Sequence, residues 1–279
     1  MISVVQLGTV DYSTGLRLQQ KLVELRKDGR IGDVLLLLEH TPVITMGRNA
    51  KQKNILASPE SLSQRGVEVF ECDRGGDVTF HGPGQLVGYP IFDLRGIPSA
   101  EGKRPTLGAI EYVRRLEEVL IRTCADFGIP TKRITGLTGV WTANAHVGTA
   151  APGCAVERSS TDPASAPEAK IAAIGVHISR AVTSHGFALN VNTDLSFFNL
   201  IIPCGIEAKP VTSLAKELNK QIPLQEVAHS VSRNFGIIFQ SQILWLDSLE
   251  ALIGTDLGIP LKVPENLRKV HADDDSAWA

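Results

Sequence analysis

Long apolar runs, a cationic N-terminus and an excess of basic residues are all missing from this sequence. The net charge is −2, so no electrostatic attraction to nucleic acid or to an anionic membrane surface is expected. Even the richest apolar run, Val34–Leu38, is far shorter than the ~20 residues that span a bilayer. The segment 1–15 has no signal-peptide pattern. We therefore expect a cytoplasmic protein with no nucleic-acid or membrane partner.

Cysteine is scarce. There are four cysteines in 279 residues, and no two of them form a C-x-x-C pair. In a reducing compartment such cysteines are free thiols, and we expect neither a metal nor a cofactor. Cys72 and Cys124 lie in periodic apolar segments and are predicted to belong to the core, where a free cysteine behaves as a small hydrophobe. Cys154 lies in a segment of small and polar residues and is a poor candidate for chemistry.

The overall amino-acid composition, 43% hydrophobic and 21% charged, is typical of a soluble globular protein. The length is ample for a sizeable core. Segment 148–168 is small, polar and proline-bearing, which predicts a flexible insertion. The acidic end, 271–279, predicts a disordered tail. We expect a single domain over residues 1–270.

Hydrophobic periodicity gives the order of the elements. The predicted helices are 13–30, a short helix that begins at Ser58-Pro59, 106–127, 212–219 and 224–239. The predicted strands are 33–39, 40–48, 67–72, 134–141, 170–178 and 186–191, with a connector at 179–185 between the last two. The order is strands first, then one long crossing helix, then further strands, with helices last. This order is typical of an α+β, or mixed α/β, fold.

The most unusual stretch is 74–90, RGGDVTFHGPGQLVGYP. Five glycines and two prolines stand among β-favouring residues. This mixture is typical of a strand interrupted by backbone shapes that only glycine tolerates and by the close approach of another group. It is also typical of a Gly/Pro-rich surface loop. Composition alone leaves both interpretations open.

The stretch 74–90 closely resembles the signature of the lipoyl(octanoyl) transferases, which are acyltransferases of the lipoate/biotin protein ligase superfamily. Three further blocks resemble the same family in the expected order: 170–175 (KIAAIG), 186–190 (GFALN) and 202–205 (IPCG). The resemblance implies a biotin/lipoate protein ligase-like fold, a larger mixed sheet flanked by helices plus a smaller sheet, as one catalytic domain. The insertion 148–168 departs from the family, whose corresponding connection is usually much shorter.

The activity that the resemblance implies is transfer of an octanoyl group from octanoyl-acyl carrier protein to a specific lysine of lipoyl domains. The acceptors would be 2-oxoacid dehydrogenase E2 subunits and glycine cleavage H protein, in the first step of endogenous protein lipoylation. Cys204 resembles the family's nucleophile, which forms a thioester intermediate, and Lys170 its partner. The substrate-contacting residues implied are Arg74, Gly75, Gly76, Asp77, Val78, Thr79, Phe80, His81, Ala173, Ile174, Gly175, Gly186, Phe187 and Ala188.

Elementary chemistry is compatible with these two roles. A free cysteine has a pKa of ~8.5, so only a few per cent is thiolate at neutral pH and an activator is needed. An ammonium group near sulfur favours the thiolate, and partial desolvation of Lys170 would let it carry protons as well. Without the resemblance, Cys204 is typical of a buried structural cysteine, and Lys170 of a solubilising charge at a strand edge.

The acyl chain is expected to lie along the stretch 74–90, with Val78, Phe80 and Leu86 offering apolar surface. His81 lies in the same stretch, and a histidine in a Gly-Pro turn often hydrogen-bonds its own loop. We expect His81 to shape the pocket, while His177 and His185 are equally available in sequence for proton transfer.

Three other functions remain open at this point. An ATP-dependent lipoate or biotin protein ligase shares the fold, but it needs contacts to nucleotide phosphates and no nucleophilic cysteine. A non-catalytic binder of acyl carrier or lipoyl domains would tolerate the loss of the Cys204 thiol. A thioesterase would let water attack the acyl-enzyme and would release free octanoate.

Overall fold

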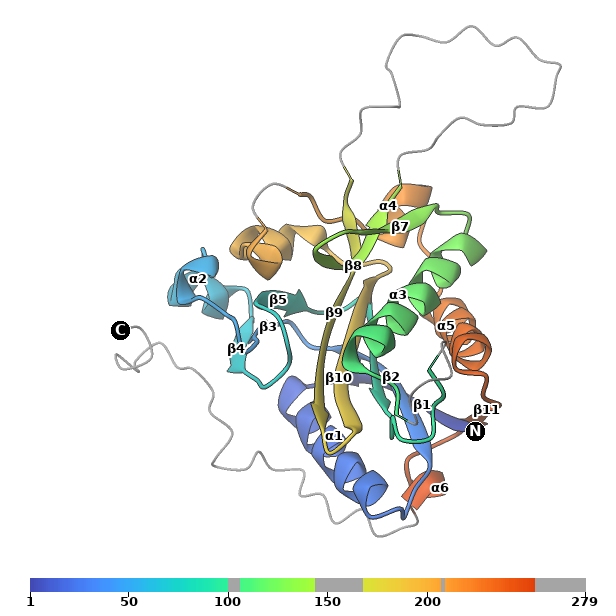
Figure 1. The fold of residues 1–279 in the computed structure, drawn as a ribbon. Coiled ribbons are helices and arrows are strands. Elements are labelled where there is room, and N and C mark those ends of the chain that lie inside the picture. Colours follow the sequence, from blue (N-terminus) through green and yellow to red (C-terminus); the bar gives the residue numbers. More distant parts are fainter. Residues whose placement is uncertain (100–105, 144–167, 207–208, 254–279) are drawn as a thin grey trace, which may run out of the picture.

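Two sheets, one large and one small, form the frame of the computed structural model (Figure 1). The structure describes residues 1–99, 106–143, 168–206 and 209–253. The large sheet has the order β11-β1-β2-β6-β10-β9-β8-β7, and the small sheet the order β4-β3-β5. The strands are β1 (Ile2–Val10), β2 (Asp33–His40), β3 (Val43–Met46), β4 (Glu68–Glu71), β5 (Val78–His81), β6 (Gln85–Ile91), β7 (Thr131–Ile134), β8 (Leu137–Thr142), β9 (Lys170–Ser179), β10 (Val182–Asn190) and β11 (Ile243–Leu246).

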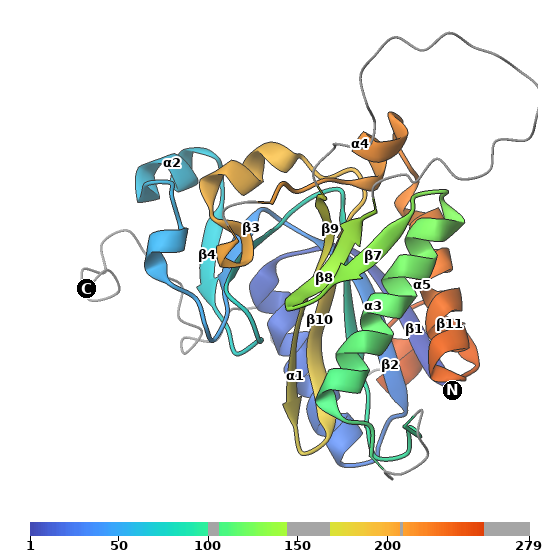
Figure 2. The same ribbon diagram turned by 45° about the horizontal axis from the view of Figure 1, so that its top comes forward.

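Helices cover both faces of the large sheet. Figures 1 and 2 show α3 and α5 side by side on one face and α1 on the other. The helices are α1 (Tyr12–Lys27), α2 (Pro59–Gln64), α3 (Ala109–Asp126), α4 (Leu214–Leu218), α5 (Leu224–Phe239) and α6 (Glu250–Ile253). Short 3₁₀ turns are η1 (Gln52–Asn54), η3 (Leu195–Leu200) and η4 (Pro203–Gly205). The predicted α+β fold, a larger sheet flanked by helices plus a smaller sheet, is confirmed.

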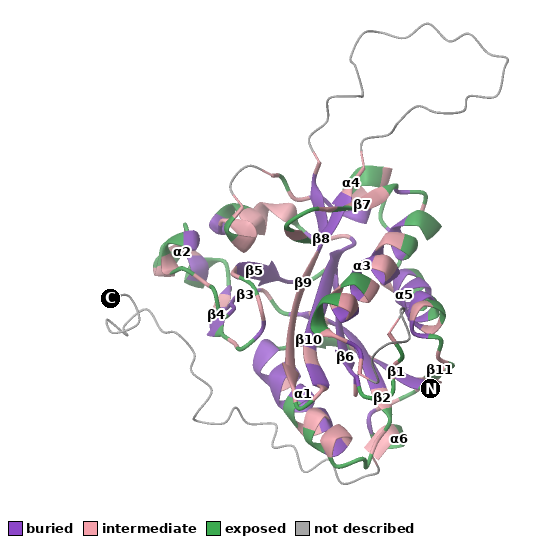
Figure 3. Cartoon of the chain, in the orientation of Figure 1, coloured by how far each residue is buried: buried purple, intermediate pink, exposed green. Residues whose placement is uncertain are grey.

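Strand β2 shows why the core has two layers. Leu35 and Leu37 pack into the cluster under α3 and α5, whereas Leu36 and Leu38 pack on the opposite face with Leu22 of α1. Successive side chains of a strand point to opposite faces, so a strand covered on both sides is apolar throughout. The continuous apolar run 33–39 therefore predicted a buried strand correctly, and Figure 3 shows the central strands as largely buried.

Local capping chemistry sets the start of several helices. The Ser58 hydroxyl accepts a hydrogen bond from the Ser61 N–H, and Pro59 occupies the first turn of α2, as the sequence predicted.

Cys124 is fully buried on the apolar face of α3, which confirms its assignment to the core. Burial raises the pKa of the Cys124 thiol to about 12, so this thiol is not a nucleophile at neutral pH.

The predicted connector at 179–185 is wrong. Strands β9 and β10 form one continuous hairpin, and only Arg180 and Ala181 make the turn. Both turn residues have positive φ, 52° and 66°. Two-residue hairpin turns of this kind usually carry Asn or Gly, whose backbones adopt positive φ at low cost. The sequence has neither residue at the turn, and the usual hairpin signal is therefore absent.

Three strands of the large sheet were not predicted: β1, β7 and β11. β1 lies between β2 and β11 and pairs with both in parallel. The insertion 148–168 and the tail 271–279 lie outside the described residues, apart from Glu168. Among the helices that the structure describes, none has the length and hydropathy needed to cross a membrane.

The α3 core layer can be tested with one truncation. Leu120 is fully buried among the residues under α3 and α5, so Leu120→Ala is expected to lower the free energy of unfolding by about 2–5 kcal/mol. Ile110 on the same helix is 81% exposed, and Ile110→Ala should change it by less than about 0.5 kcal/mol. Urea unfolding followed by circular dichroism measures both, and equal effects of the two substitutions would contradict the packing.

Candidate active site

Lys170 and Cys204 meet at the junction of the two sheets. The Lys170 Nζ donates a hydrogen bond to the Cys204 Sγ over 3.2 Å. Lys170 is the first residue of β9, and Cys204 is the middle residue of the 3₁₀ turn η4. The lysine side chain is buried, with 7% of its surface exposed. An ammonium group held this close to sulfur stabilises the thiolate, which is the reactive form of a cysteine.

The backbone at Cys204 is held in an unusual conformation. Its φ is 57° and its ψ is 19°, in the left-handed region that costs a non-glycine residue roughly 1–2 kcal/mol. The turn is tied down from the small-sheet side, since the Ile202 N–H donates to the Asn54 carbonyl over 2.7 Å. The Asn54 side chain in turn donates to the Asp77 carboxylate over 2.6 Å. Strained backbone of this kind persists only where neighbouring contacts determine it.

A glycine completes the fit of this turn. A Cβ at Gly205 would lie 2.7 Å from the Asp77 Oδ2, and the φ of Gly205 is +68°. Any other side chain at this position would therefore meet both a steric and a conformational penalty. The carboxylate of Asp77 thus supports the thiol-bearing turn through Asn54 and through close packing.

Lys170 is held in place by a second set of contacts. Its Nζ lies 4.9 Å from the centroid of the Trp141 ring, a cation–π distance. Trp141 is also the partner of Lys170 in the pairing of β8 with β9. A Cβ at Gly139 would lie 3.2 Å from the Lys170 Cε, so the glycine leaves room for the lysine side chain. Trp141 and Gly139 were not among the expected site residues.

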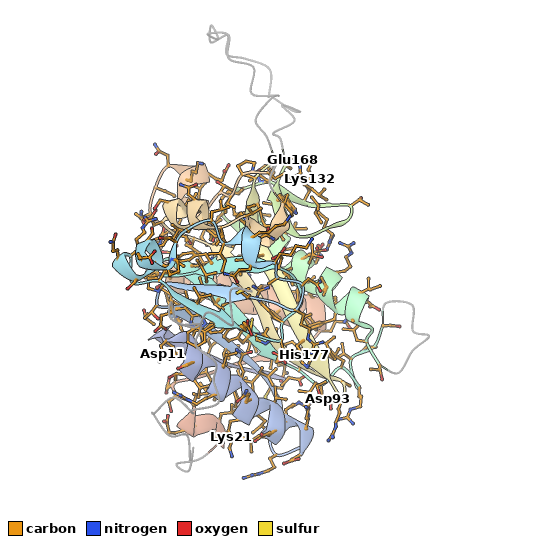
Figure 4. All side chains as sticks on the ribbon, turned by 90° about the vertical axis from the view of Figure 1, so that its left-hand side faces the viewer. Asp11, Lys21, Asp93, Lys132, Glu168 and His177 are labelled. Atoms are coloured by element: carbon orange, nitrogen blue, oxygen red, sulfur yellow. The ribbon has the colours of Figure 1, made fainter. Side chains whose placement is uncertain are left out.

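The entry to β9 is anchored by an ion-pair cluster. Glu168 forms salt bridges with Lys132, over 2.6 Å, and with Lys209. Figure 4 labels Lys132 and Glu168 side by side at the end of the molecule where β9 begins. These two lysines hold the pKa of the Glu168 carboxyl well below its usual range. The cluster fixes the chain two residues before the catalytic candidate Lys170.

A narrow cavity runs from Cys204 along the β9–β10 hairpin, beneath the stretch 74–81. Its lining includes twelve of the fourteen residues expected to contact substrate, together with Tyr12, Val87, Tyr89, His185 and Cys204. The expected residues that line it are Arg74, Gly75, Gly76, Asp77, Thr79, His81, Ala173, Ile174, Gly175, Gly186, Phe187 and Ala188. Segments distant in sequence therefore meet around one space.

The expectation that Val78, Phe80 and Leu86 line the cavity is wrong. Val78 and Phe80 point into the core of the small sheet, where the Phe80 ring stacks on Phe197 with centroids 4.7 Å apart. Leu86 packs under α3. Side chains alternate along β5, so Thr79 and His81 face the cavity when Val78 and Phe80 face away. The apolar side chains that line the cavity are those of Val87, Tyr89 and Ala188, which face α1. The Phe187 side chain packs on the opposite face, under α3 and α5.

The glycines of the four family-like blocks mainly allow backbone segments to pack closely together. A Cβ on Gly175 would lie 2.7 Å from the Gly75 carbonyl oxygen, and one on Gly186 would lie 2.1 Å from the Gly88 carbonyl oxygen. The Gly75 N–H donates to the Val176 carbonyl over 3.0 Å. The loop that carries Arg74 is thereby held directly on β9, and it roofs the cavity at this point.

Arg74 lies in this roof with its guanidinium buried. It donates to the carbonyl and the hydroxyl of Thr45, over 2.6 and 2.9 Å from Nη2, and to the Gly75 carbonyl over 3.1 Å from Nη1. Thr45 belongs to β3, so Arg74 connects the loop to the small sheet. Thr45 was not identified from the sequence, because nothing near it in the chain indicates a partner for an arginine.

The histidines are engaged with groups other than the thiol. His81 donates from Nδ1 to the Gln85 Oε1 over 2.8 Å, and His185 donates from Nε2 to the Asp73 Oδ1 over 2.7 Å. Burial lowers the pKa of His81 to about 3, so its ring is neutral at physiological pH. The hydrogen bond to Gln85 holds the ring against the wall of the cavity. Among the residues that the structure describes, no group of His, Cys, Asp and Glu has the arrangement of a metal site.

A half-buried cysteine beside a buried lysine lies at one end of a narrow cavity, on a two-sheet α+β frame. The frame itself is that of protein ligases for lipoate. A lipoate protein ligase structure from T. acidophilum, described as the putative ligase Ta0514, aligns with a TM-score of 0.57 over 89% of each chain at 12% identity. A lipoate-protein ligase A bound with ATP aligns at a TM-score of 0.55.

Sequence comparison narrows the assignment. The model of the lipoyl protein ligase A/B catalytic domain matches residues 11–236. An octanoyltransferase of Koribacter versatilis is 62% identical over 98% of both chains, and one of Acidobacterium capsulatum is 56% identical over 89% of this chain and 94% of its own. The chain belongs to the lipoyl protein ligase A/B catalytic domain family, and within it to the octanoyltransferase branch. The family expected from the sequence motifs is confirmed.

The reactivity of Cys204 tests its contact with Lys170. We expect Lys170→Ala to slow the alkylation of Cys204 by iodoacetamide at pH 7, because the thiol loses the amine 3.2 Å away. Lys209→Ala is the matched control, since Lys209 also stacks on Trp141, at 5.6 Å, and should change the rate much less. The rate of alkylation at Cys204 is followed by peptide mass spectrometry. An unchanged rate in Lys170→Ala would contradict the assignment.

The buried neutral histidines predict a loss of stability in mild acid. Burial lowers the pKa of His40 to about 4 and that of His81 to about 3, below the value of ~6.5 in the unfolded chain. The unfolded state therefore binds more protons as the pH falls below 6.5, and each histidine removes about 1.4 kcal/mol of stability per pH unit down to its folded pKa. Urea unfolding at pH 7, 6 and 5 measures this slope. A flat profile would mean that the rings are protonated in the folded protein.

Proposed function

We propose that this protein transfers an octanoyl group from octanoyl-acyl carrier protein to a specific lysine of a lipoyl domain, through a thioester on Cys204. The observation that carries the proposal is the 3.2 Å contact between the Lys170 Nζ and the Cys204 Sγ at one end of the cavity. The octanoyltransferase name of relatives at 62% and 56% identity supports the choice of acyl group. The acceptors proposed are lipoyl domains of 2-oxoacid dehydrogenase E2 subunits and glycine cleavage H protein, in the cytoplasm.

In the first half-reaction, the Cys204 thiolate attacks the carbonyl carbon of the carrier thioester. The carbon–sulfur bond to the carrier breaks, and the departing thiolate takes a proton from the Lys170 ammonium. Exchange of one thioester for another is close to isoenergetic, so this step needs no ATP.

In the second half-reaction, the amine of the acceptor lysine attacks the acyl-enzyme and forms an amide. A free lysine has a pKa of ~10.4, so on the order of one in a thousand is neutral at pH 7 and a base must take its proton. Lys170 is the base proposed, because its amine lies beside the sulfur that carries the acyl group. The acceptor's ammonium group loses two protons in forming the amide, of which one passes to Lys170 and the other to solvent. Amide formation from a thioester is downhill, and Cys204 leaves as a thiolate with the Lys170 ammonium beside it.

We expect the acyl chain to enter this cavity, whose volume of about 50 Å³ must widen to hold it. Val87 and Tyr89 give it apolar lining, and Ala173 and Ala188 keep it open beside Cys204. Burial of seven methylene or methyl carbons at ~0.8 kcal/mol each amounts to about 5 kcal/mol, which is enough to prefer such a chain over a short one. Asp77 and Arg74 are proposed as supporting residues of this site, since their hydrogen bonds position the turn and the roof.

Intact-protein mass after incubation with octanoyl-acyl carrier protein, without ATP, tests the proposal. We expect one octanoyl adduct on the wild type, none on Cys204→Ser, and full discharge by an apo-lipoyl domain. Cys72→Ser is the matched control and should keep the adduct, since the Cys72 thiol is bound to the Met46 carbonyl outside the lining of the cavity.

The same experiment separates the rival functions. Octanoylation that strictly requires ATP would establish a ligase instead. Release of free octanoate without an acceptor would indicate a thioesterase. Binding of the carrier with no adduct under any condition would leave a non-catalytic binder, and an adduct that survives Cys204→Ser would show that another residue is the nucleophile.

A further inference from the structure

A second cavity lies beyond the far end of the first. It has a volume of about 410 Å³ and is bounded by α1, by the loop at Cys72 and Asp73, and by the outer half of the β9–β10 hairpin. Leu16 and Val23 of α1 and Val182 of β10 give it an apolar side. Figure 4 labels His177, which lines this cavity, well away from Glu168 at the start of β9. The second cavity therefore lies at the opposite end of the hairpin from the Lys170–Cys204 pair.

His185 separates the two cavities, because it lines both of them. Regular strand geometry at this position of β10 would not place the His185 side chain between the two cavities. The neighbours Ser184 and Gly186 line the cavities, and strict alternation would turn His185 to the other face of the sheet. Its φ of 56° breaks the alternation. A non-glycine residue with positive φ inside a strand is uncommon and is associated with functional sites.

The ring of His185 is fixed where it stands. Its Nε2 donates to the Asp73 Oδ1 over 2.7 Å, its backbone N–H donates to the Gln19 Oε1 over 2.7 Å, and only 4% of the residue is exposed. The adjoining roof is also fixed, since Gly75 is hydrogen-bonded to Val176 of β9. Burial lowers the pKa of His185, so the ring presents a neutral surface to the first cavity. These contacts make a rigid partition.

The distance along the hairpin matches an octanoyl chain. Cys204 and the paired residues Ala173 and Ala188 line the same space, and His185 is paired with Val176. The interval from Ala173 to Val176 is three residues, a rise of about 10 Å, which is roughly the extended length of an eight-carbon acyl chain. The chain would therefore reach the partition with its terminal methyl group.

We propose that His185, held by Asp73, is the end wall of the acyl cavity and sets the accepted chain length near eight carbons. Longer chains are excluded by this ring rather than by lack of space, because the second cavity lies directly behind it. This inference depends on the proposed acyl transfer through Cys204. The residue acts on specificity alone, and it takes no part in proton transfer.

The test is a competition between octanoyl- and dodecanoyl-acyl carrier protein for Cys204, read by intact-protein mass. His185→Gly removes the ring and suits the positive φ. Each additional methylene that can be buried is worth about fourfold, so we expect the ratio of dodecanoyl to octanoyl acylation to rise at least tenfold. His185→Asn, a smaller residue that also tolerates positive φ, should raise the ratio by a smaller factor and serves if the glycine variant does not fold.

His177→Asn is the matched control. His177 lines the second cavity but not the first, so the acylation ratio should remain within about twofold of the wild type. Thermal unfolding by circular dichroism checks the fold of every variant.

Three outcomes would overturn the proposal. An unchanged ratio in folded, acylated His185→Gly and His185→Asn would show that the ring is not the wall. An equal change in His177→Asn would show that the effect does not depend on the partition between the two cavities. Loss of all acylation in both folded histidine variants would give His185 a chemical role. Failure of the wild type itself to take an acyl group from either carrier would instead mean that the proposed function is wrong.

Discussion

The contact between the Lys170 ammonium and the Cys204 sulfur is the interaction on which the site depends. The two residues are 34 positions apart in the sequence. Neither side chain would suit its position without the other. A buried ammonium without a partner costs several kcal/mol, and a lone thiol at neutral pH is mostly unreactive. The buried lysine and the half-buried cysteine lie 3.2 Å apart, at one end of the cavity. In the proposed reaction, the same contact both positions the two side chains and activates the thiol.

Both sheets are needed to hold that contact. The large sheet supplies Lys170 at the start of β9, with Trp141 beside it and Glu168 clamped just before it. The small-sheet side supplies the support for Cys204, through Asn54 and the carboxylate of Asp77. The left-handed backbone of Cys204 is tolerated because these contacts determine it. A shift of either sheet would separate sulfur from nitrogen, so the relative position of the sheets is itself part of the active site.

The shape of the acyl cavity follows from places where backbone segments cross. Gly75 meets Val176, and Gly175 leaves room for the Gly75 carbonyl, so the loop that carries Arg74 closes over the hairpin. Where β10 departs from regular alternation, at His185, a polar ring lines the cavity and closes the path proposed for the acyl chain. Length selection and acyl transfer are thus assigned to opposite ends of one hairpin, and each end can change without direct contact with the other.

Local sequence patterns determined the elements that depend on neighbours in the chain: the helix 224–239, the buried strand β2, the cap at Ser58 and the α+β class. The signature blocks also identified the family. Tertiary structure alone decided the 3.2 Å approach of Lys170 to Cys204, the turning of Phe80 away from the cavity and the position of His185. These features depend on pairing between distant strands, on strand register and on positive φ at residues other than glycine. Hydrophobic periodicity in the sequence indicates none of the three.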